Sequence, residues 1–252
     1  SDIGGKVPGS MPIDATSIFQ EGVRIPPIKL YKQGQYNEDV FKLIMHQVRT
    51  PDWCSADLNA LIASCRVAKN RVVEMAERFG DDVFVSACEE LLERNFKAMK
   101  ALIAESIGHD PVFFEDYICD DGMGFGPYKI KCTMWREGDK VVLDFEGTDP
   151  QSPASINFFL NENMLRMFFG IYMIMVFDPQ ILFNDGFYDL IDVRIPEGSL
   201  LKPKFPAALS GRTHALGRIF DILGALLGQK TPEFLNAAGF SSSPHLFYSG
   251  FD

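Results

Sequence analysis

Charged side chains at the start of one apolar helical segment are the first candidates for chemistry in this 252-residue chain. Arg212, His214, Arg218 and Asp221 lie close together there, and a spacing of four residues places His214 beside Arg218 on a helix. Because a helix N-terminus favours negative charge, Arg212 and His214 are candidate contacts for an anion or an anionic substrate. A solvated polar helix face is the alternative that this spacing leaves open.

Asp2 is a second candidate, because it stands directly before Ile3, Gly4 and Gly5. A carboxylate is a hard ligand that suits manganese, magnesium or zinc, and neighbouring glycines let the backbone approach a bound ion closely. No partner ligand lies nearby in the sequence. The spacing alone therefore does not define a metal site.

The glycine-rich tract at residues 122–126 does not form a nucleotide-binding motif. It precedes a predicted strand, and it lacks both GxGxxG and GxxxxGK[ST]. We expect a turn that links helix to sheet at this position. If ATP takes part in the activity, its site is expected on another chain.

Composition argues against two classes of partner. With 24 Lys and Arg against 34 Asp and Glu, the formal net charge is −10, which disfavours nucleic-acid binding. The longest apolar run, residues 167–177, is too short to span a membrane.

The cysteines include no CxxC pair, and we expect Cys65, Cys88 and Cys132 to be small buried side chains, which suits a reducing cytoplasm.

Glycine, proline and apolar periodicity predict the elements that hold these side chains. Residues 1–36 combine many glycines and prolines with many apolar residues, which predicts an ordered, irregular segment packed on a scaffold. Asn37 is a plausible N-cap for a helix. Apolar residues at helical spacing then predict long helices over 51–79 and 81–107, separated by Gly80. We expect these two helices to pack as an antiparallel hairpin.

After Gly108 the apolar period changes from helical to alternating. The alternation predicts a β-hairpin over residues 128–145. Further predicted elements are an apolar helix at 162–177, a short strand at 192–195, and a last helix at 212–227 with Ser210 as its candidate cap. The predicted fold class is α+β: an irregular Gly/Pro-rich N-terminal segment and a long antiparallel helical hairpin precede a mixed β-sheet with packed helices.

Two regions are predicted along the chain. Residues 1–108 form a Gly/Pro-rich segment with the candidate metal ligand, followed by helices, and residues 109–252 form a mixed α/β region. The chain opens abruptly at Ser1 without a methionine, and it stops at residues 248–252 in what reads as a strand. We therefore expect an internal portion of a larger subunit.

The first 31 residues resemble the signature of the hydantoinase B/5-oxoprolinase family. The resemblance is carried by DIGG at 2–5, PGSMP at 8–12 and the EG, RIPP and KLY groups within 21–31. It continues through residues 37–51 and the LSGRTH segment at 209–214. Within the family, the sequence is most similar to the α subunit of acetone carboxylase.

The resemblance implies an ATP-dependent ligase that carboxylates acetone with bicarbonate, giving acetoacetate, AMP and two phosphates. It implies a manganese ion on this subunit, ATP with Mg²⁺ on a hydantoinase A-like β subunit, and a small γ subunit in an α2β2γ2 assembly. By this resemblance Asp2 becomes a metal ligand whose His partners lie upstream of Ser1, so the isolated fragment is expected to be inactive. Arg24 and Lys29, or Arg212 with His214, become candidate contacts for phosphate or carboxylate groups.

Two alternatives stay open beside the carboxylase. The B subunit of an ATP-dependent hydantoinase or 5-oxoprolinase shares the DIGG and RIPP-KLY stretches but hydrolyses a cyclic amide. A non-catalytic assembly scaffold is a different class, and the long helix pair favours it. None of these interpretations predicts which residues perform the chemistry.

Overall fold

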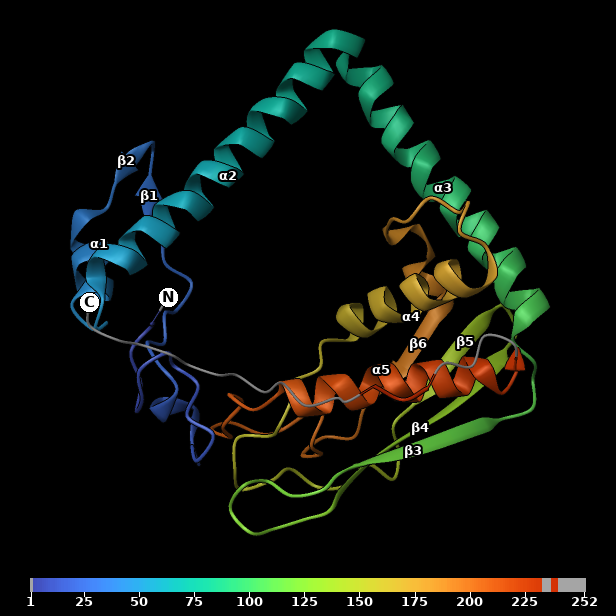
Figure 1. Cartoon of the computed structure of the whole chain (residues 1–252). Helices are drawn as coiled ribbons and strands as arrows, with labels where there is room; N and C mark the ends of the chain where they lie inside the picture. Colours follow the sequence, from blue (N-terminus) through green and yellow to red (C-terminus); the bar gives the residue numbers. More distant parts are fainter. Residues whose placement is uncertain (1, 233–236, 240–252) are drawn as a thin grey trace.

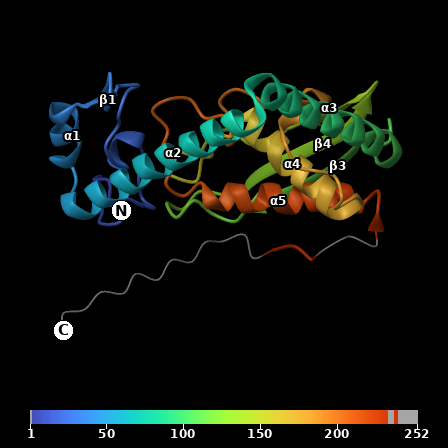
Figure 2. The same ribbon diagram turned by 90° about the horizontal axis from the view of Figure 1, so that it is seen from above.

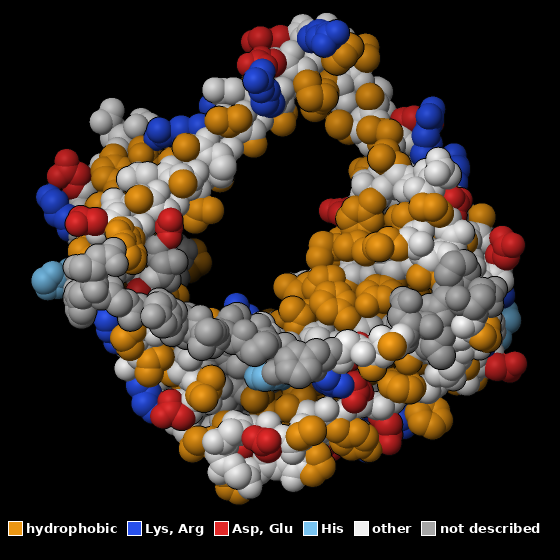
Figure 3. Space-filling model, in the orientation of Figure 1, with side chains coloured by type: hydrophobic (Ala, Val, Ile, Leu, Met, Phe, Trp, Pro, Cys, Tyr) orange, Lys and Arg blue, Asp and Glu red, His pale blue; other side chains and the backbone are white. Residues whose placement is uncertain are grey.

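The computed structural model describes residues 2–232 and 237–239 and confirms the predicted α+β class (Figure 1). An N-terminal body and an α/β body are joined by two long helices, α2 (Pro51–Phe79) and α3 (Asp81–Ser106). The two bodies also touch directly, so the described residues surround an opening, which Figure 3 shows in space-filling form. The strand predicted at residues 248–252 lies outside the described residues.

The N-terminal body is irregular, as its glycines and prolines predicted. Its regular elements are a single 3-10 turn, η1 (Ile18–Gln20), a two-stranded ribbon of β1 (Tyr31–Lys32) and β2 (Gln35–Tyr36), and helix α1 (Glu38–Met45). The Asn37 side chain accepts a hydrogen bond from the Val40 N–H, so Asn37 is the N-cap that the sequence predicted.

Helices α2 and α3 have the predicted extents, but the predicted antiparallel packing is wrong. The two helices meet at Gly80 and diverge as the arms of a V (Figure 1), and seen from above they extend in opposite directions from their meeting point (Figure 2). The apolar side chains of Leu61, Val72 and Phe79, which were to form the contact, are each more than half exposed. The reason is that each arm packs at its far end: Cys54 is buried in the N-terminal body, and Met99 in the α/β body.

The same divergence overturns the prediction for two cysteines. Cys65 on α2 and Cys88 on α3 are exposed, because no partner helix covers their faces in the described part of the chain. Cys132 is buried as predicted. Burial, reinforced by the charge of Asp144, raises the pKa of the Cys132 thiol, which keeps it protonated and unreactive.

The α/β body contains a four-stranded sheet with the order β3 (Val112–Ile118), β4 (Tyr128–Glu137), β5 (Lys140–Asp144) and β6 (Ile191–Arg194). The predicted hairpin is confirmed as the antiparallel pair β4 and β5, and β6 adds in parallel to β5. Strand β3 was not predicted, and it pairs along its whole length with β4. The glycine tract at 122–126 therefore links two strands, not a helix to the sheet.

Two helices cover this sheet and complete the core. Helix α5 (Thr213–Gly228) packs on β3 and β4, and helix α4 (Glu162–Phe177), which has the predicted bounds, packs on α5 and β6 (Figure 2). A second 3-10 segment, η2 (Asp185–Leu190), packs between α3 and α4 and buries Phe187. No helix among the described residues combines the length and apolar composition that a membrane span needs.

Candidate functional site

The two bodies are joined at a junction between residues that are far apart in sequence. One carboxylate oxygen of Glu21 accepts hydrogen bonds from the N–H groups of Leu209 and Ser210, both at 2.6 Å. The Ser210 hydroxyl donates to the carbonyl of Pro12 at 2.6 Å. Ser210 thus fastens the N-terminal body and does not cap α5, which begins after Arg212 with no side-chain cap. The predicted capping role of Ser210 is wrong.

Two further hydrogen bonds extend this junction. The Ile18 N–H donates to the carbonyl of Pro206 at 2.9 Å, and the Ser155 hydroxyl donates to the carbonyl of Ile13 at 2.8 Å. Ser155 and Ser210 are both buried, so their bonds are shielded from water. The N-terminal segment is therefore held against the start of α5 by directional polar contacts.

A cavity of about 460 Å³ lies at this junction, and we refer to it as the arginine cavity. Arg24 and Arg212 line it from opposite bodies. The Arg24 guanidinium lies 4.8 Å from the ring centroids of both Phe19 and Phe205, so the two rings hold its plane in place. Other residues of its wall are Ile3, Ser10, Glu21 and Leu209.

Neither guanidinium in the arginine cavity has an ionic partner within the described residues. No carboxylate lies within ion-pairing distance of Arg24 or Arg212 there, whereas Arg49, Arg194 and Arg218 each pair with an aspartate. One oxygen of the Glu21 carboxylate in the same wall, Oε1, accepts both of its hydrogen bonds from backbone N–H groups. The cavity therefore offers two guanidinium groups that have no ionic partner in the described part of a chain whose net charge is −10.

Asp2 lies beside this cavity, but its surroundings do not fit a metal ion. Its carboxylate accepts hydrogen bonds from the N–H groups of Gly4 (2.8 Å) and Gly9 (3.0 Å), and Arg49 donates to both oxygens at 3.2 Å. The Ser10 hydroxyl lies 3.3 Å away. Burial would raise the pKa of Asp2, but the hydrogen bonds from Gly4, Gly9 and Arg49 outweigh it and lower the pKa.

Those bonds occupy the roughly four lone-pair positions that a carboxylate offers. A cation at Asp2 would also lie against the Arg49 guanidinium, which repels it. Across residues 2–232 and 237–239, no three His, Cys, Asp or Glu side chains gather as a metal site. The His ligands predicted upstream of Ser1 lie outside this chain, and the metal role of Asp2 stays a prediction that the present geometry does not support.

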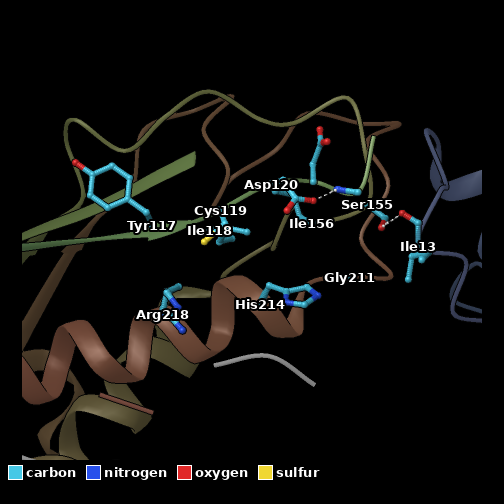
Figure 4. A pocket seen from close by; sticks show the side chains of 12 residues that line it. Ile13, Tyr117, Ile118, Cys119, Asp120, Ser155, Ile156, Gly211, His214 and Arg218 are labelled. Atoms are coloured by element: carbon cyan, nitrogen blue, oxygen red, sulfur yellow. Dashed lines mark hydrogen bonds between the residues drawn. The ribbon is translucent and has the colours of Figure 1, made fainter. Parts of the chain in front are cut away.

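A second cavity of about 350 Å³ adjoins the junction, where Ile13, Ser155 and Gly211 line it (Figure 4). His214 and Arg218, one turn apart on α5, line it opposite the loop that carries Cys119 and Asp120. Arg218 donates to Asp116 on β3 at 2.8 Å. This chamber, which we call the histidine cavity, presents an imidazole with no hydrogen bond to the described residues.

A buried carboxylate, Asp121, shapes the loop of the histidine cavity. It accepts hydrogen bonds from the N–H groups of Met123 and Phe125 and from the hydroxyls of Tyr128 and Ser152. Burial opposes its charge, but these four donors together lower the pKa of Asp121 below its ordinary value. The Asp121 side chain therefore stays ionised and fixes the loop between β3 and β4.

Three of the five predicted site residues line two adjoining cavities. Arg24 and Arg212 line one cavity, and His214 lines the adjoining one. Lys29 lines neither cavity and is exposed. Sequence reasoning missed the roles of Glu21, Arg49 and Asp121; for Asp121, the glycines that follow it were a turn signal that could have indicated a fixed loop.

The fold and these cavities define an α+β protein with a polar junction site between two bodies. The chain belongs to the hydantoinase B/oxoprolinase family, whose family model matches residues 1–252. It is 31% identical to the beta chain of the caprolactamase of Pseudomonas jessenii over 94% of this chain and 41% of the relative. It is 29% identical to the B component of a putative D-/L-hydantoinase of Pseudomonas sp. strain NS671, again over 94% of this chain and 41% of the relative.

Two solved structures share the fold. The ATP-dependent caprolactamase from Pseudomonas jessenii matches with a TM-score of 0.81 and 30% identity, covering 92% of this chain and 40% of that one. Nucleotide-free acetone carboxylase matches with a TM-score of 0.79 and 21% identity, covering 95% and 34%, a likeness that shows the fold alone. The chain thus spans about two fifths of the length of its caprolactamase and hydantoinase relatives.

Proposed function

We propose that this chain is part of the subunit that binds the reacting group in an ATP-dependent enzyme, and that the arginine cavity holds an anionic intermediate or product. The observation that carries this proposal is the pair of guanidinium groups, Arg24 and Arg212, that line one cavity without an ionic partner in the described residues. Guanidinium groups bind carboxylate and phosphate in a bidentate manner, which gives both affinity and orientation.

The chemistry of both candidate reactions produces such anions. Hydrolysis of a cyclic amide leaves a carboxylate, and carboxylation of a ketone adds one to carbon. Activation by ATP passes a phosphoryl group or its equivalent to a poor reactant, which adds further negative charge. Two arginines without an ionic partner among the described residues favour an anionic intermediate over the neutral substrate, which lowers the barrier to forming that intermediate.

Hydrolysis of a cyclic amide is the first candidate for the substrate class. It is supported by the names of two relatives at 31% and 29% identity, a caprolactamase and a putative hydantoinase. The ATP-dependent carboxylation of acetone with bicarbonate, which the sequence predicted, is the second candidate. Its support is an acetophenone carboxylase delta subunit of Aromatoleum aromaticum that is 24% identical over 83% of this chain and 31% of the relative.

Both candidates require partners that this chain does not supply. We propose an A-type subunit that binds ATP with Mg²⁺, because the glycine tract here is a strand connection and not a phosphate loop. A third, small subunit in an α2β2γ2 assembly belongs to the acetone carboxylase alternative. Manganese belongs to that alternative too, and the described residues do not form its site.

The test is the substrate dependence of ATP consumption by the full-length subunit with its ATP-binding partner. Caprolactam, hydantoin and 5-oxoproline form one arm, and acetone with bicarbonate forms the other. The first candidate predicts that a cyclic amide alone stimulates ATP consumption and yields the ring-opened acid. Stimulation by acetone with bicarbonate contradicts it in favour of the carboxylase, and stimulation by neither arm favours the non-catalytic scaffold.

A further inference from the structure

We propose that Arg49 is a positioning residue for the arginine cavity, and that Asp2 serves as its anchor and not as a metal ligand. The inference rests on the proposed function, since it assigns Arg49 a role in orienting the anion site. Arg49 lies in the connection between α1 and α2, away from the cavity wall. It therefore acts on the site through other residues.

The contacts of Arg49 converge on one loop. Its guanidinium donates to both carboxylate oxygens of Asp2, to the carbonyl of Val7 at 3.2 Å, and to the carbonyl of Gly5. The Asp2 side chain is only 10% exposed, whereas that of Arg49 is 41% exposed. Arg49, just before helix α2, thus holds residues 2–7 in place, although these residues lie more than forty positions earlier in the sequence.

Close packing of two glycines fixes the same loop on both sides. A Cβ atom at Gly4 would lie 2.8 Å from the carbonyl oxygen of Gln47, and one at Gly5 would lie 2.8 Å from the carbonyl oxygen of Gln20. Both glycines have positive φ, at 88° and 89°. The loop is therefore wedged between the α1–α2 connection and the segment that carries Glu21.

Two backbone hydrogen bonds transmit this position to the cavity. The Lys6 N–H donates to the carbonyl of Gln20 at 2.7 Å, and the Val23 N–H donates to the carbonyl of Ile3 at 2.9 Å. These bonds bracket the residues that place Arg24 in the wall of the arginine cavity. A loop released from Arg49 would therefore shift the cavity at the position of one of its two cations.

The competing explanation is that Asp2 binds a metal and Arg49 is only a neighbour. The two explanations differ in how the residues depend on each other. An anchor pair loses its effect when either partner is removed, so the double variant is no worse than the worse single variant. A metal ligand would lose its ion on substitution whether or not Arg49 is present.

The experiment uses the full-length subunit in complex with its ATP-binding partner, as Asp2→Asn, Arg49→Met, Arg49→Lys and the double variant D2N/R49M. Inorganic phosphate binding is followed by calorimetry, and bound metal by elemental analysis. We expect each of D2N and R49M to weaken phosphate binding roughly tenfold, the double variant to match the worse single variant, and R49K to recover part of the loss. Metal content stays at the wild-type level in every variant.

Additive losses in the double variant, or metal lost in D2N but kept in R49M, would overturn the proposal. Amide hydrogen exchange separates it from the proposed function. Even if phosphate does not bind the wild-type complex, which defeats the proposed function, R49M should raise exchange in residues 2–10 and 20–24 while the core strands β4 and β5 stay protected. Unchanged exchange in those segments contradicts the positioning role, and exchange raised throughout the subunit shows general unfolding, which contradicts it too.

Discussion

The two bodies that meet at the arginine cavity are held together by different forces. In the α/β body, the largest fully buried side chains, among them Phe145, Phe169 and Phe187, form one apolar core. In residues 2–98, the buried apolar side chains among the described residues are few: Pro12, Ala15, Met45 and Cys54. There the fold depends on hydrogen bonds and on glycines that allow close backbone contact.

This difference assigns separate tasks to the two bodies. Apolar burial is non-directional, whereas a hydrogen bond restricts both the distance and the direction between the two groups that it joins. The α/β body therefore supplies stability, and the N-terminal body supplies the geometry of the cavity. Substitutions in the first should lower the free energy of unfolding, and substitutions in the second should alter the site with a smaller loss of stability.

The largest expected effect is that of Phe187→Ala in the apolar core. Phe187 is fully buried and packs so closely on α4 that a Cβ at Gly170 would lie 2.0 Å from its ring. We expect a loss of about 3–5 kcal/mol in the free energy of unfolding, measured by urea denaturation. The control is Met175→Ala on α4; its side chain is 73% exposed, and the substitution should change the free energy of unfolding by less than about 0.5 kcal/mol.

A smaller effect is expected from Asp121→Asn, and it should depend on pH. The variant weakens charge-assisted hydrogen bonds to a buried carboxylate, so we expect a loss of about 2–3 kcal/mol at pH 7. Because the folded state lowers the pKa of Asp121, its contribution is present above the unfolded pKa of about 3.9 and is lost as pH falls through the folded value.

Urea denaturation of wild type and D121N from pH 7 to pH 2.5 measures this difference. The gap between the two proteins should be constant above about pH 5 and should narrow below pH 4. A gap that widens on acidification would show that Asp121 is not stabilised in its ionised form. Asp139→Asn, an exposed carboxylate that pairs with Lys100, is the matched control and should show little change.

The junction itself should give the smallest loss of stability and the clearest local effect. Glu21→Ala removes the acceptor for two N–H groups at 2.6 Å, and we expect a loss of about 1–2 kcal/mol. Hydrogen exchange should rise at Leu209 and Ser210, while the amides of the core helix α4 keep their protection. Equal loss of protection in α4 would show that the two bodies are one cooperative unit and not separately stabilised. Glu197→Ala, an exposed partner of Lys202, is the control.

Local signals in the sequence predicted the elements, and long-range contacts determined the rest. The Asn37 cap, the break at Gly80 and the β-hairpin over residues 128–145 each depend on residues close in sequence, and all three are confirmed. Strand β3 was missed, because polar and apolar residues do not alternate along its sequence, VFFEDYI. The boundary predicted at residue 108 is not tested by these contacts and stays a prediction.

The sequence could not predict the divergence of α2 and α3 or the lining of the arginine cavity, and the reason is the same in both cases: each depends on which segments meet in the fold. Apolar periodicity shows that a helix face is apolar but not which partner covers it, so Cys65 and Cys88 were expected to be buried. Similarly, the sequence offered Arg24 and Arg212 as separate alternatives, and only the folded arrangement shows that both line one cavity.

The central claim is that Arg24 and Arg212 together hold an anion, and calorimetric titration of the full-length subunit with inorganic phosphate tests it most directly. Wild type should be compared with Arg24→Gln, Arg212→Gln and the control Arg71→Gln, whose exposed side chain pairs with Glu74 on α2. We predict that each cavity variant raises the Kd roughly tenfold or more while R71Q leaves it unchanged. Equal affinity in all four proteins would contradict the claim.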